Sequence, residues 1–288
     1  MNESPTILMP DRYLHLPPLC STADVTDSRT KPTLAEVRAG LVTGVPGAAA
    51  TDAVTGIRGV EPGFPATIAA EDDYRDTVIG SATRSGIRHF VVVGPGLPPS
   101  NLAHDVVRNA LPEGEDFRVL YVTGDAGVQA RLAAAGTRRD QVRWSDPAGM
   151  GIDVCVLAAH HQGFLTFDEP VCVLAGSTLQ HIHCPEYLIS GLWGQLPHGS
   201  RMSITQIVAP RAASTAASRL EQVDHLLLAY TGTSLMPRSA AEMRKLFAHW
   251  EIVDRHVTTP VPSGQDPVGV RPVAVMNMTV RATLSGGI

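Results

Sequence analysis

Two histidines lie one residue apart in a segment that could carry proton-transfer chemistry. His181 and His183 flank Ile182 in the run QHIHC, and Cys184 follows directly. An imidazole has an unperturbed pKa near about 6.5, so a histidine beside a substrate can take up or release a proton at neutral pH. We therefore predict His181 and His183 as candidate catalytic bases. The alternative for each is a solvated or hydrogen-bonded side chain without a chemical role.

The same cluster could also form a metal site or supply a nucleophile. Two histidines separated by one residue on a strand point to the same side, but a structural zinc site needs four ligands and no further pair is spaced to supply them. No Ser–His–Asp or Cys–His–Asp arrangement can be identified from the spacing. We predict no metal, and we interpret Cys184 as a small buried side chain.

An acidic cluster, Glu71, Asp72 and Asp73, lies in a segment predicted as a helix over residues 67–85. Carboxylates on a helix above a crevice could bind a substrate amine. The alternative is that they only stabilise the positive end of the helix dipole, because they fall in the first predicted turn. Asp72 and Asp73 are retained as candidate catalytic residues.

The elements that would position these side chains follow from alternating apolar runs and helical patterns. Short apolar runs predict buried strands, and the segments between them have helical spacing, so we expect a mostly parallel sheet covered on both faces. The tail at 268–283 alternates and predicts an antiparallel C-terminal strand. The other strands are expected at 88–93, 117–122, 141–145, 170–175, 201–208 and 250–257, and the helices between them at 100–111, 126–135, 184–196, 214–230 and 239–249.

The N-terminal part has a different composition. Residues 1–32 are rich in Pro, Ser, Thr and Asp and are predicted to form an irregular arm. Residues 33–43 have helical spacing with Thr33 as N-cap, and 44–66 are interpreted as a loop or lid because of their Gly, Ala and Pro content. The predicted organisation is an arm and lid-like region at 1–66 followed by one α/β domain at 67–288.

A glycine turn follows the strand expected at 88–93. Gly94 and Gly96 would allow a tight turn and a close approach of the backbone to a ligand, although such turns also occur without a ligand. Ligands of parallel α/β sheets lie at the carboxyl ends of the strands. Gly94, Gly96, Asp125 and Asp146 all follow predicted strands, so we place them around one crevice with the histidine cluster.

The longer run GIRHFVVVGPGLPPSNLAHDVV resembles an actinobacterial family of S-adenosylmethionine-dependent methyltransferases whose first strand reads roughly GIRQFLDIGTGLPT. The resemblance implies an α/β fold of the Rossmann-like class I methyltransferase type, with a mostly parallel sheet and an antiparallel C-terminal strand. It also implies Gly94, Gly96, Asp125 and Asp146 as cofactor-binding positions. The similar segments are 86–107, 120–125, 145–147, 167–182 and 238–247.

The chain departs from that family's pattern at acidic positions that hold the cofactor. Val92 stands where the family has an aspartate, and Thr123 stands where an acidic residue accepts the ribose hydroxyls. Asp72, Asp73 and Tyr74 replace an Asn–Arg pair. A hydroxyl cannot replace the charge-assisted hydrogen bonds of a carboxylate, which are roughly twice as strong as neutral ones. We therefore expect a degenerate S-adenosylmethionine site and no cofactor.

The function predicted from these departures is a biosynthetic enzyme of natural-product metabolism that no longer uses S-adenosylmethionine. It would act by acid/base chemistry, such as cyclisation, elimination or intramolecular substitution, on a small amino-bearing intermediate; closure of a small aza-ring is one example. One alternative is an S-adenosylmethionine-dependent methyltransferase. A second is a non-catalytic subunit that binds a protein partner.

Composition limits the partners. The chain has 288 residues, 23 basic and 28 acidic, with a net charge of −5 and 44% hydrophobic residues. This balance disfavours a dedicated nucleic-acid binder and a disordered chain. No apolar run is long enough for a membrane helix, and the four cysteines are scattered. We expect a cytoplasmic protein with a small-molecule substrate, no nucleic acid and no membrane.

Overall fold

The structure is a computed structural model that describes six parts of the chain. The chain divides into two units, Met1–Thr30 and Lys31–Ile288, and all described residues belong to the second. The arm predicted for residues 1–32 therefore lies almost entirely outside the described residues. The described parts are 31–94, 102–135, 138, 140–148, 150–260 and 273–283.

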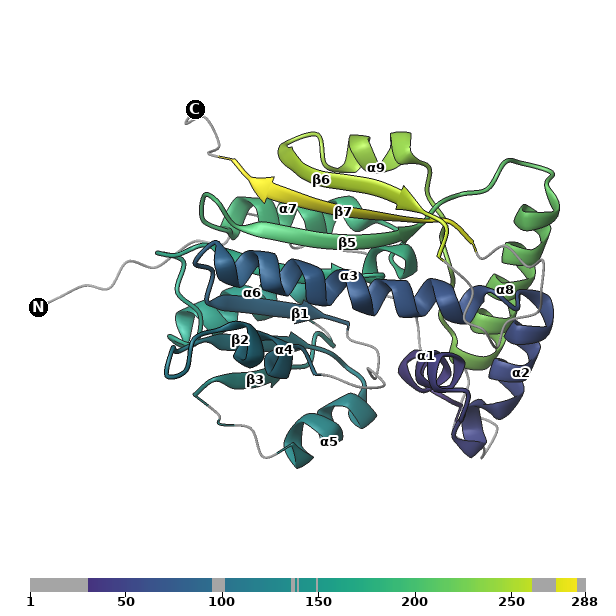
Figure 1. The fold of residues 1–288 in the computed structure, drawn as a ribbon, viewed down its shortest axis with the longest axis horizontal. Coiled ribbons are helices and arrows are strands. Elements are labelled where there is room, and N and C mark those ends of the chain that lie inside the picture. The colour runs from purple at the N-terminus through teal and green to yellow at the C-terminus, as the bar shows by residue number, and fades with distance from the viewer. Residues whose placement is uncertain are drawn as a thin grey trace, which may run out of the picture. The chain divides into compact units, whose positions relative to one another are not determined.

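A seven-stranded sheet forms the centre of the described part of the chain, in the order β3-β2-β1-β4-β5-β7-β6 (Figure 1). The first five strands of this order pair in parallel, and β7 runs antiparallel between β5 and β6. The predicted fold class and the antiparallel C-terminal strand are confirmed. The strands are β1 (His89–Val93), β2 (Arg118–Val122), β3 (Val142–Ser145), β4 (Val171–Gly176), β5 (Arg201–Ile207), β6 (Trp250–Thr258) and β7 (Val275–Ala282).

Helices cover both faces of this sheet, which explains the continuous apolar runs of its central strands. On β1, Val91 and Val93 pack toward α6 and α7, whereas Phe90 and Val92 pack toward α3 and α4. The sequence patterns predict the helices of the described residues except α2 and α6. The helices are α1 (Leu34–Thr43), α2 (Thr51–Val60), α3 (Phe64–Arg84), α4 (Ala103–Ala110), α5 (Ala126–Ala134), α6 (Ile152–His161), α7 (Pro185–Gln195), α8 (Thr215–Thr231) and α9 (Ala240–Leu246), with short 3₁₀ turns η2 (Ala48–Ala50) and η3 (Thr178–His181).

The predicted loop at 44–66 contains helix α2, so that part of the prediction is wrong. Ala53, Val54 and Ile57 are buried on one face of α2, which packs with α1 and α8 in a separate apolar cluster. A Cβ on Gly56 would lie 3.4 Å from Leu226 of α8, at van der Waals contact, so the two helices pack closely at this point. Tertiary burial therefore outweighs the poor helix propensity of the glycines in α2.

Helix α3 begins at Phe64, with Pro65 in its first turn, and not at residue 67 as predicted. Glu71, Asp72 and Asp73 consequently lie in the interior of α3, beyond the turn in which the helix dipole acts. The dipole therefore does not explain the acidic cluster. Within the described residues, no helix combines the length and the apolarity needed to span a membrane.

Candidate functional site

A cavity of about 70 Å³ lies where the carboxyl ends of β1 and β4 meet α1 and α3. This is the position at which parallel α/β sheets bind ligands. Of the residues predicted around one crevice at the strand ends, Gly94 and Asp72 line this cavity. Apolar side chains, among them Val92 and Leu174, form part of its wall. Its charged and hydroxyl-bearing lining residues are Arg38, Glu71, Asp72, Arg75, Tyr121, Ser177, Thr178, Ser203 and Thr205.

Gly94 forms the end of β1 at this cavity and has a positive φ of 53°. A Cβ at this position would lie 2.8 Å from Oγ1 of Thr178. The Thr178 hydroxyl in turn donates a hydrogen bond of 2.8 Å to the carbonyl oxygen of Val93. The conformation and the space both require glycine, so the predicted turn at Gly94 brings the end of β1 against η3.

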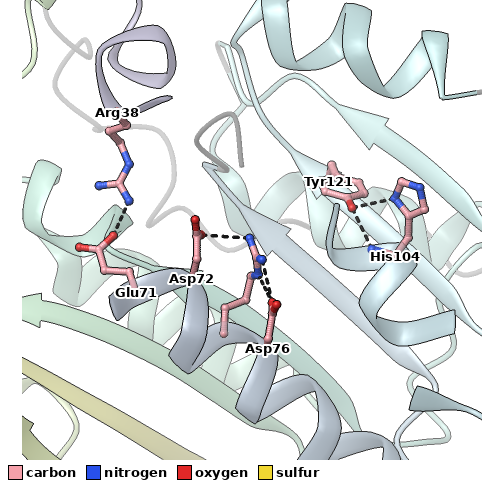
Figure 2. Close-up of polar contacts among 7 residues, drawn as sticks. Arg38, Glu71, Asp72, Asp76, His104 and Tyr121 are labelled. Atoms are coloured by element: carbon pink, nitrogen blue, oxygen red, sulfur yellow. Dashed lines mark hydrogen bonds and ion pairs between the residues drawn. The ribbon is translucent and has the colours of Figure 1, made fainter. Parts of the chain in front are cut away.

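Glu71 is the most deeply buried charged group of the cavity, with 5% of its surface exposed. Its Oε2 accepts a hydrogen bond from Nη2 of Arg38, which reaches down from α1 (Figure 2). Its Oε1 is buried and has no hydrogen bond of ordinary geometry within the described residues, although Ser177 lies close enough to lower the pKa of the carboxyl group. Burial raises the pKa of Glu71, and the Arg38 charge partly offsets that increase.

Asp72 lines the same cavity from the next position of α3. Its Oδ1 accepts a hydrogen bond of 3.1 Å from Nη1 of Arg75, whose Nε donates one of 2.8 Å to Asp76 (Figure 2). Burial raises the pKa of Asp72, and Arg75 counteracts the shift. Asp73 is exposed and does not line the cavity. Of the two predicted aspartates, the structure brings Asp72 alone to the site.

His181 does not lie on the wall of this cavity. Its Nδ1 is 2.8 Å from the carbonyl oxygen of Ser234, which can only accept, so Nδ1 carries a proton and Nε2 of the neutral ring is an acceptor. Nε2 is buried and has no hydrogen-bond partner within the described residues. Burial lowers the pKa of His181 to about 4, which makes the ring a weak base.

His183 and Cys184 are both exposed, between η3 and α7, and neither lines the cavity. The interpretation of Cys184 as a buried side chain is wrong, because it lies at the first residue before α7 where the chain turns on the surface. Within the described residues, no group of three or more His, Cys, Asp or Glu side chains is arranged to hold a metal ion.

Asp125 and Asp146 follow the ends of β2 and β3, and each bonds to the local backbone. Oδ1 of Asp125 caps α5 by accepting the N–H of Val128 at 3.0 Å. Oδ1 of Asp146 accepts the N–H of Ala148 at 2.9 Å and would lie 3.2 Å from a Cβ on Gly124. Neither aspartate lines the cavity. Gly96 lies outside the described residues.

Two cavity residues that the sequence analysis did not single out are Arg38 and Tyr121. Arg38 lies in an amphipathic helix with no local motif, 33 positions before its partner Glu71. In the sequence, Tyr121 is indistinguishable from the apolar residues beside it in a buried strand. No signal in the sequence alone distinguishes either from a structural residue.

Comparisons with known proteins identify a family and a fold. The model of a family described as S-adenosyl methyltransferase matches residues 48–266. A protein of Thermobifida fusca YX, described as a candidate methyltransferase, matches 88% of this chain and 96% of its own, with 18% identity and a TM-score of 0.72. A DUF574 family protein of Streptomyces avermitilis matches 87% of this chain and 97% of its own, with 21% identity and a TM-score of 0.71. At these identities the two structures show the fold alone. No curated protein matches this chain.

The family match overturns two predictions made from the sequence. The expectation that no cofactor is used, and with it the acid/base reaction independent of S-adenosylmethionine, are both wrong. Both were inferred from Val92 in β1, from Thr123 directly after β2, and from the replacement of an Asn–Arg pair by Asp72, Asp73 and Tyr74. The charged groups that line the cavity come from α1 and α3. Residues of the strands give no information about them.

Proposed function

This chain belongs to the S-adenosyl methyltransferase family, and we propose that it transfers the methyl group of S-adenosylmethionine to a small-molecule acceptor. When bound, that cofactor supplies a methyl group on a positively charged sulfur, which a nucleophile can attack. The observation that carries the proposal is the buried carboxylate of Glu71. The group lines a cavity at the ends of β1 and β4, where Arg38 bonds one of its oxygens and the other has no hydrogen bond of ordinary geometry within the described residues.

The charges of the cavity complement the amino-acid end of the cofactor. That end carries an ammonium and a carboxylate. We infer that the carboxylate of Glu71 pairs with the ammonium, and Arg38 has N–H donors besides the Nη2 that bonds Glu71. A cavity of about 70 Å³ can hold small polar groups such as an ammonium and a carboxylate. We infer that the amino-acid end occupies the cavity and the nucleoside end lies outside it.

Under this proposal, the carboxylate that binds the cofactor comes from a different element than in the family pattern. Val92 lines the cavity and has no polar group, while Glu71 directs a carboxylate into the same space from α3. We propose that Glu71 replaces the missing carboxylate of the strand and that Asp72 adds negative charge beside the cationic cofactor. Gly94 lets the backbone approach closely, and Asp125 and Asp146 remain the proposed positions at the nucleoside end. His181, His183 and Asp73 receive no role.

Calorimetric titration with three ligands tests the proposal on the unmodified protein. S-adenosylhomocysteine and S-adenosylmethionine are expected to bind with micromolar dissociation constants. Methylthioadenosine has the nucleoside and sulfur but lacks the amino-acid end, so it is expected to bind at least about 100-fold more weakly, as the loss of two charge-assisted contacts requires. Absence of binding by S-adenosylhomocysteine up to millimolar concentration would overturn the proposal. Equal affinity for S-adenosylhomocysteine and methylthioadenosine would overturn the assignment of the cavity.

A further inference from the structure

Tyr121 lines the cavity from β2 and forms a second buried pair with His104 of α4. Figure 2 shows this pair. Each residue has only 1% of its surface exposed. The Tyr121 hydroxyl lies 3.1 Å from the backbone nitrogen of His104 and 2.8 Å from Nδ1 of the same residue. One hydroxyl thus contacts both the main chain and the side chain of a residue in the first turn of α4.

The hydrogen-bond inventory assigns the protons in this pair. The backbone N–H of His104 can only donate, so the Tyr121 oxygen accepts there. Burial raises the pKa of Tyr121 and lowers that of His104, so the phenol and the ring are both neutral. If Nδ1 also donated, the buried hydroxyl proton would lose this partner, which is costly. The hydroxyl therefore donates to Nδ1, and His104 carries its proton on Nε2, 3.7 Å from Oδ1 of Asp105.

The contact to the backbone replaces a hydrogen bond that the N-cap side chain of a helix usually accepts. The N-cap of α4 is Leu102, whose side chain has no oxygen with which to cap the helix. The early N–H groups of a helix need acceptors from outside it. The Tyr121 hydroxyl supplies one from the neighbouring strand β2. Leu102 and Ala103, directly before His104, both line the cavity.

We propose that Tyr121 and His104 are positioning residues of the cofactor site, because the Tyr121 hydroxyl caps α4 from β2 and thereby holds Leu102 and Ala103 as one wall of the cavity. His104 orients that hydroxyl by accepting its proton. This inference rests on the proposed function for its effect on the cofactor. Its effect on the start of α4 does not depend on any ligand.

Variants at both positions test the pair, with Tyr74→Phe as the matched control. The Tyr74 hydroxyl is also buried and bonds Thr279 at 2.7 Å, but Tyr74 does not line the cavity. Tyr121→Phe is expected to weaken S-adenosylhomocysteine binding about tenfold, the value of one hydrogen bond, while Tyr74→Phe leaves it unchanged. His104→Ala is expected to match Tyr121→Phe. In His104→Asn the amide oxygen can accept from Tyr121, and affinity should return to within about threefold of the unmodified protein.

Two measurements without a ligand separate this inference from the proposed function. Nitrogen NMR of the His104 ring should show the Nε2–H tautomer, and the His104 amide should exchange its hydrogen faster in Tyr121→Phe than in Tyr74→Phe. An Nδ1–H tautomer, unchanged amide exchange in Tyr121→Phe, or equal effects of the two Tyr→Phe changes on affinity would overturn the positioning role. If S-adenosylhomocysteine fails to bind the unmodified protein, the proposed function is wrong. The exchange and tautomer results then still test whether Tyr121 and His104 hold the start of α4.

Discussion

Glu61 and Glu71 are both buried, and each is bonded by an arginine of another helix. Glu61 ends α2 and is fully buried; its Oε2 accepts a hydrogen bond of 2.9 Å from Nε of Arg219 on α8. Glu71 lies in α3 and is bonded by Arg38 of α1. In both glutamates Oε1 is buried without a hydrogen bond within the described residues. Only Glu71 lines the cavity at the ends of the strands.

The comparison teaches that an unpartnered carboxylate oxygen is not by itself a sign of a ligand. A buried ion pair is weak evidence for stability, because desolvation of the two charges offsets much of their attraction. In the part of the chain that the structure describes, Glu61 is bonded by Arg219, whereas Glu71 lines a space that can hold water or a ligand. The position at the strand ends, rather than the burial, makes Glu71 a candidate for cofactor binding.

The largest expected effect is a difference in the free energy of unfolding between variants of the two arginines. Arg219→Ala leaves the fully buried Glu61 without its partner and is expected to lower the free energy of unfolding by about 3–5 kcal/mol. Arg38→Ala should cost clearly less, because water in the cavity can solvate Glu71. Urea denaturation of both variants measures the difference. A larger loss in Arg38→Ala would show that the cavity does not solvate Glu71.

The next effect separates the two glutamates by cofactor affinity. Glu71→Gln keeps the shape and an acceptor but removes the charge facing the ammonium. S-adenosylhomocysteine binding is expected to weaken about 10- to 100-fold, as for a hydrogen bond to a charged group. Glu61→Gln should leave the dissociation constant unchanged. Calorimetric titration of both variants checks this, and similar losses in the two would remove the distinction between them.

A smaller effect is expected at two glycines from the same two regions. Gly232 ends α8 with φ of 73° and has open space around its Cα, so Gly232→Ala should cost about 1 kcal/mol from the left-handed conformation alone. Gly94→Ala adds a clash with Thr178 and should cost about 2 kcal/mol. Thermal unfolding and titration with S-adenosylhomocysteine are the measurements. Weakened binding is expected for Gly94→Ala only, and equal behaviour would contradict the role of the turn.

The smallest effect is a pH dependence carried by Glu71. Because burial raises its pKa above the unfolded value of 4.5, the folded protein binds this proton more tightly than the unfolded chain. Its contribution to stability is therefore fully present below the unfolded pKa and is lost as pH rises through the raised one. The free energy of unfolding of the unmodified protein, relative to that of Glu71→Gln, should increase as the pH falls from 7 to about 4.5. Urea denaturation across this range would show the opposite slope if the pKa were lowered.

Much of the fold could be predicted from the sequence because its signals are local. The buried strand β1, the glycine turn at Gly94 and the antiparallel strand β7 all follow from apolar runs, alternation and turn chemistry. Helix α2 could not be predicted, since its glycines weaken the local pattern and its packing against α8 stabilises it. The start of α3 at Phe64 places the acidic cluster, Glu71 to Asp73, beyond the second turn of the helix, so the helix dipole does not explain it.

What the sequence by itself determined about the site is the crevice, through the strand ends, and the resemblance to a methyltransferase family. The tertiary structure decided which charges face that crevice. Arg38 and Glu71 lie on different helices and meet only after both have packed, while His183 and Asp73 remain on the surface. The loss of carboxylates at Val92 and Thr123 was therefore misinterpreted as loss of the cofactor. Local patterns specify strands and turns through short-range sterics and burial, but the partner of a buried charge depends on long-range packing.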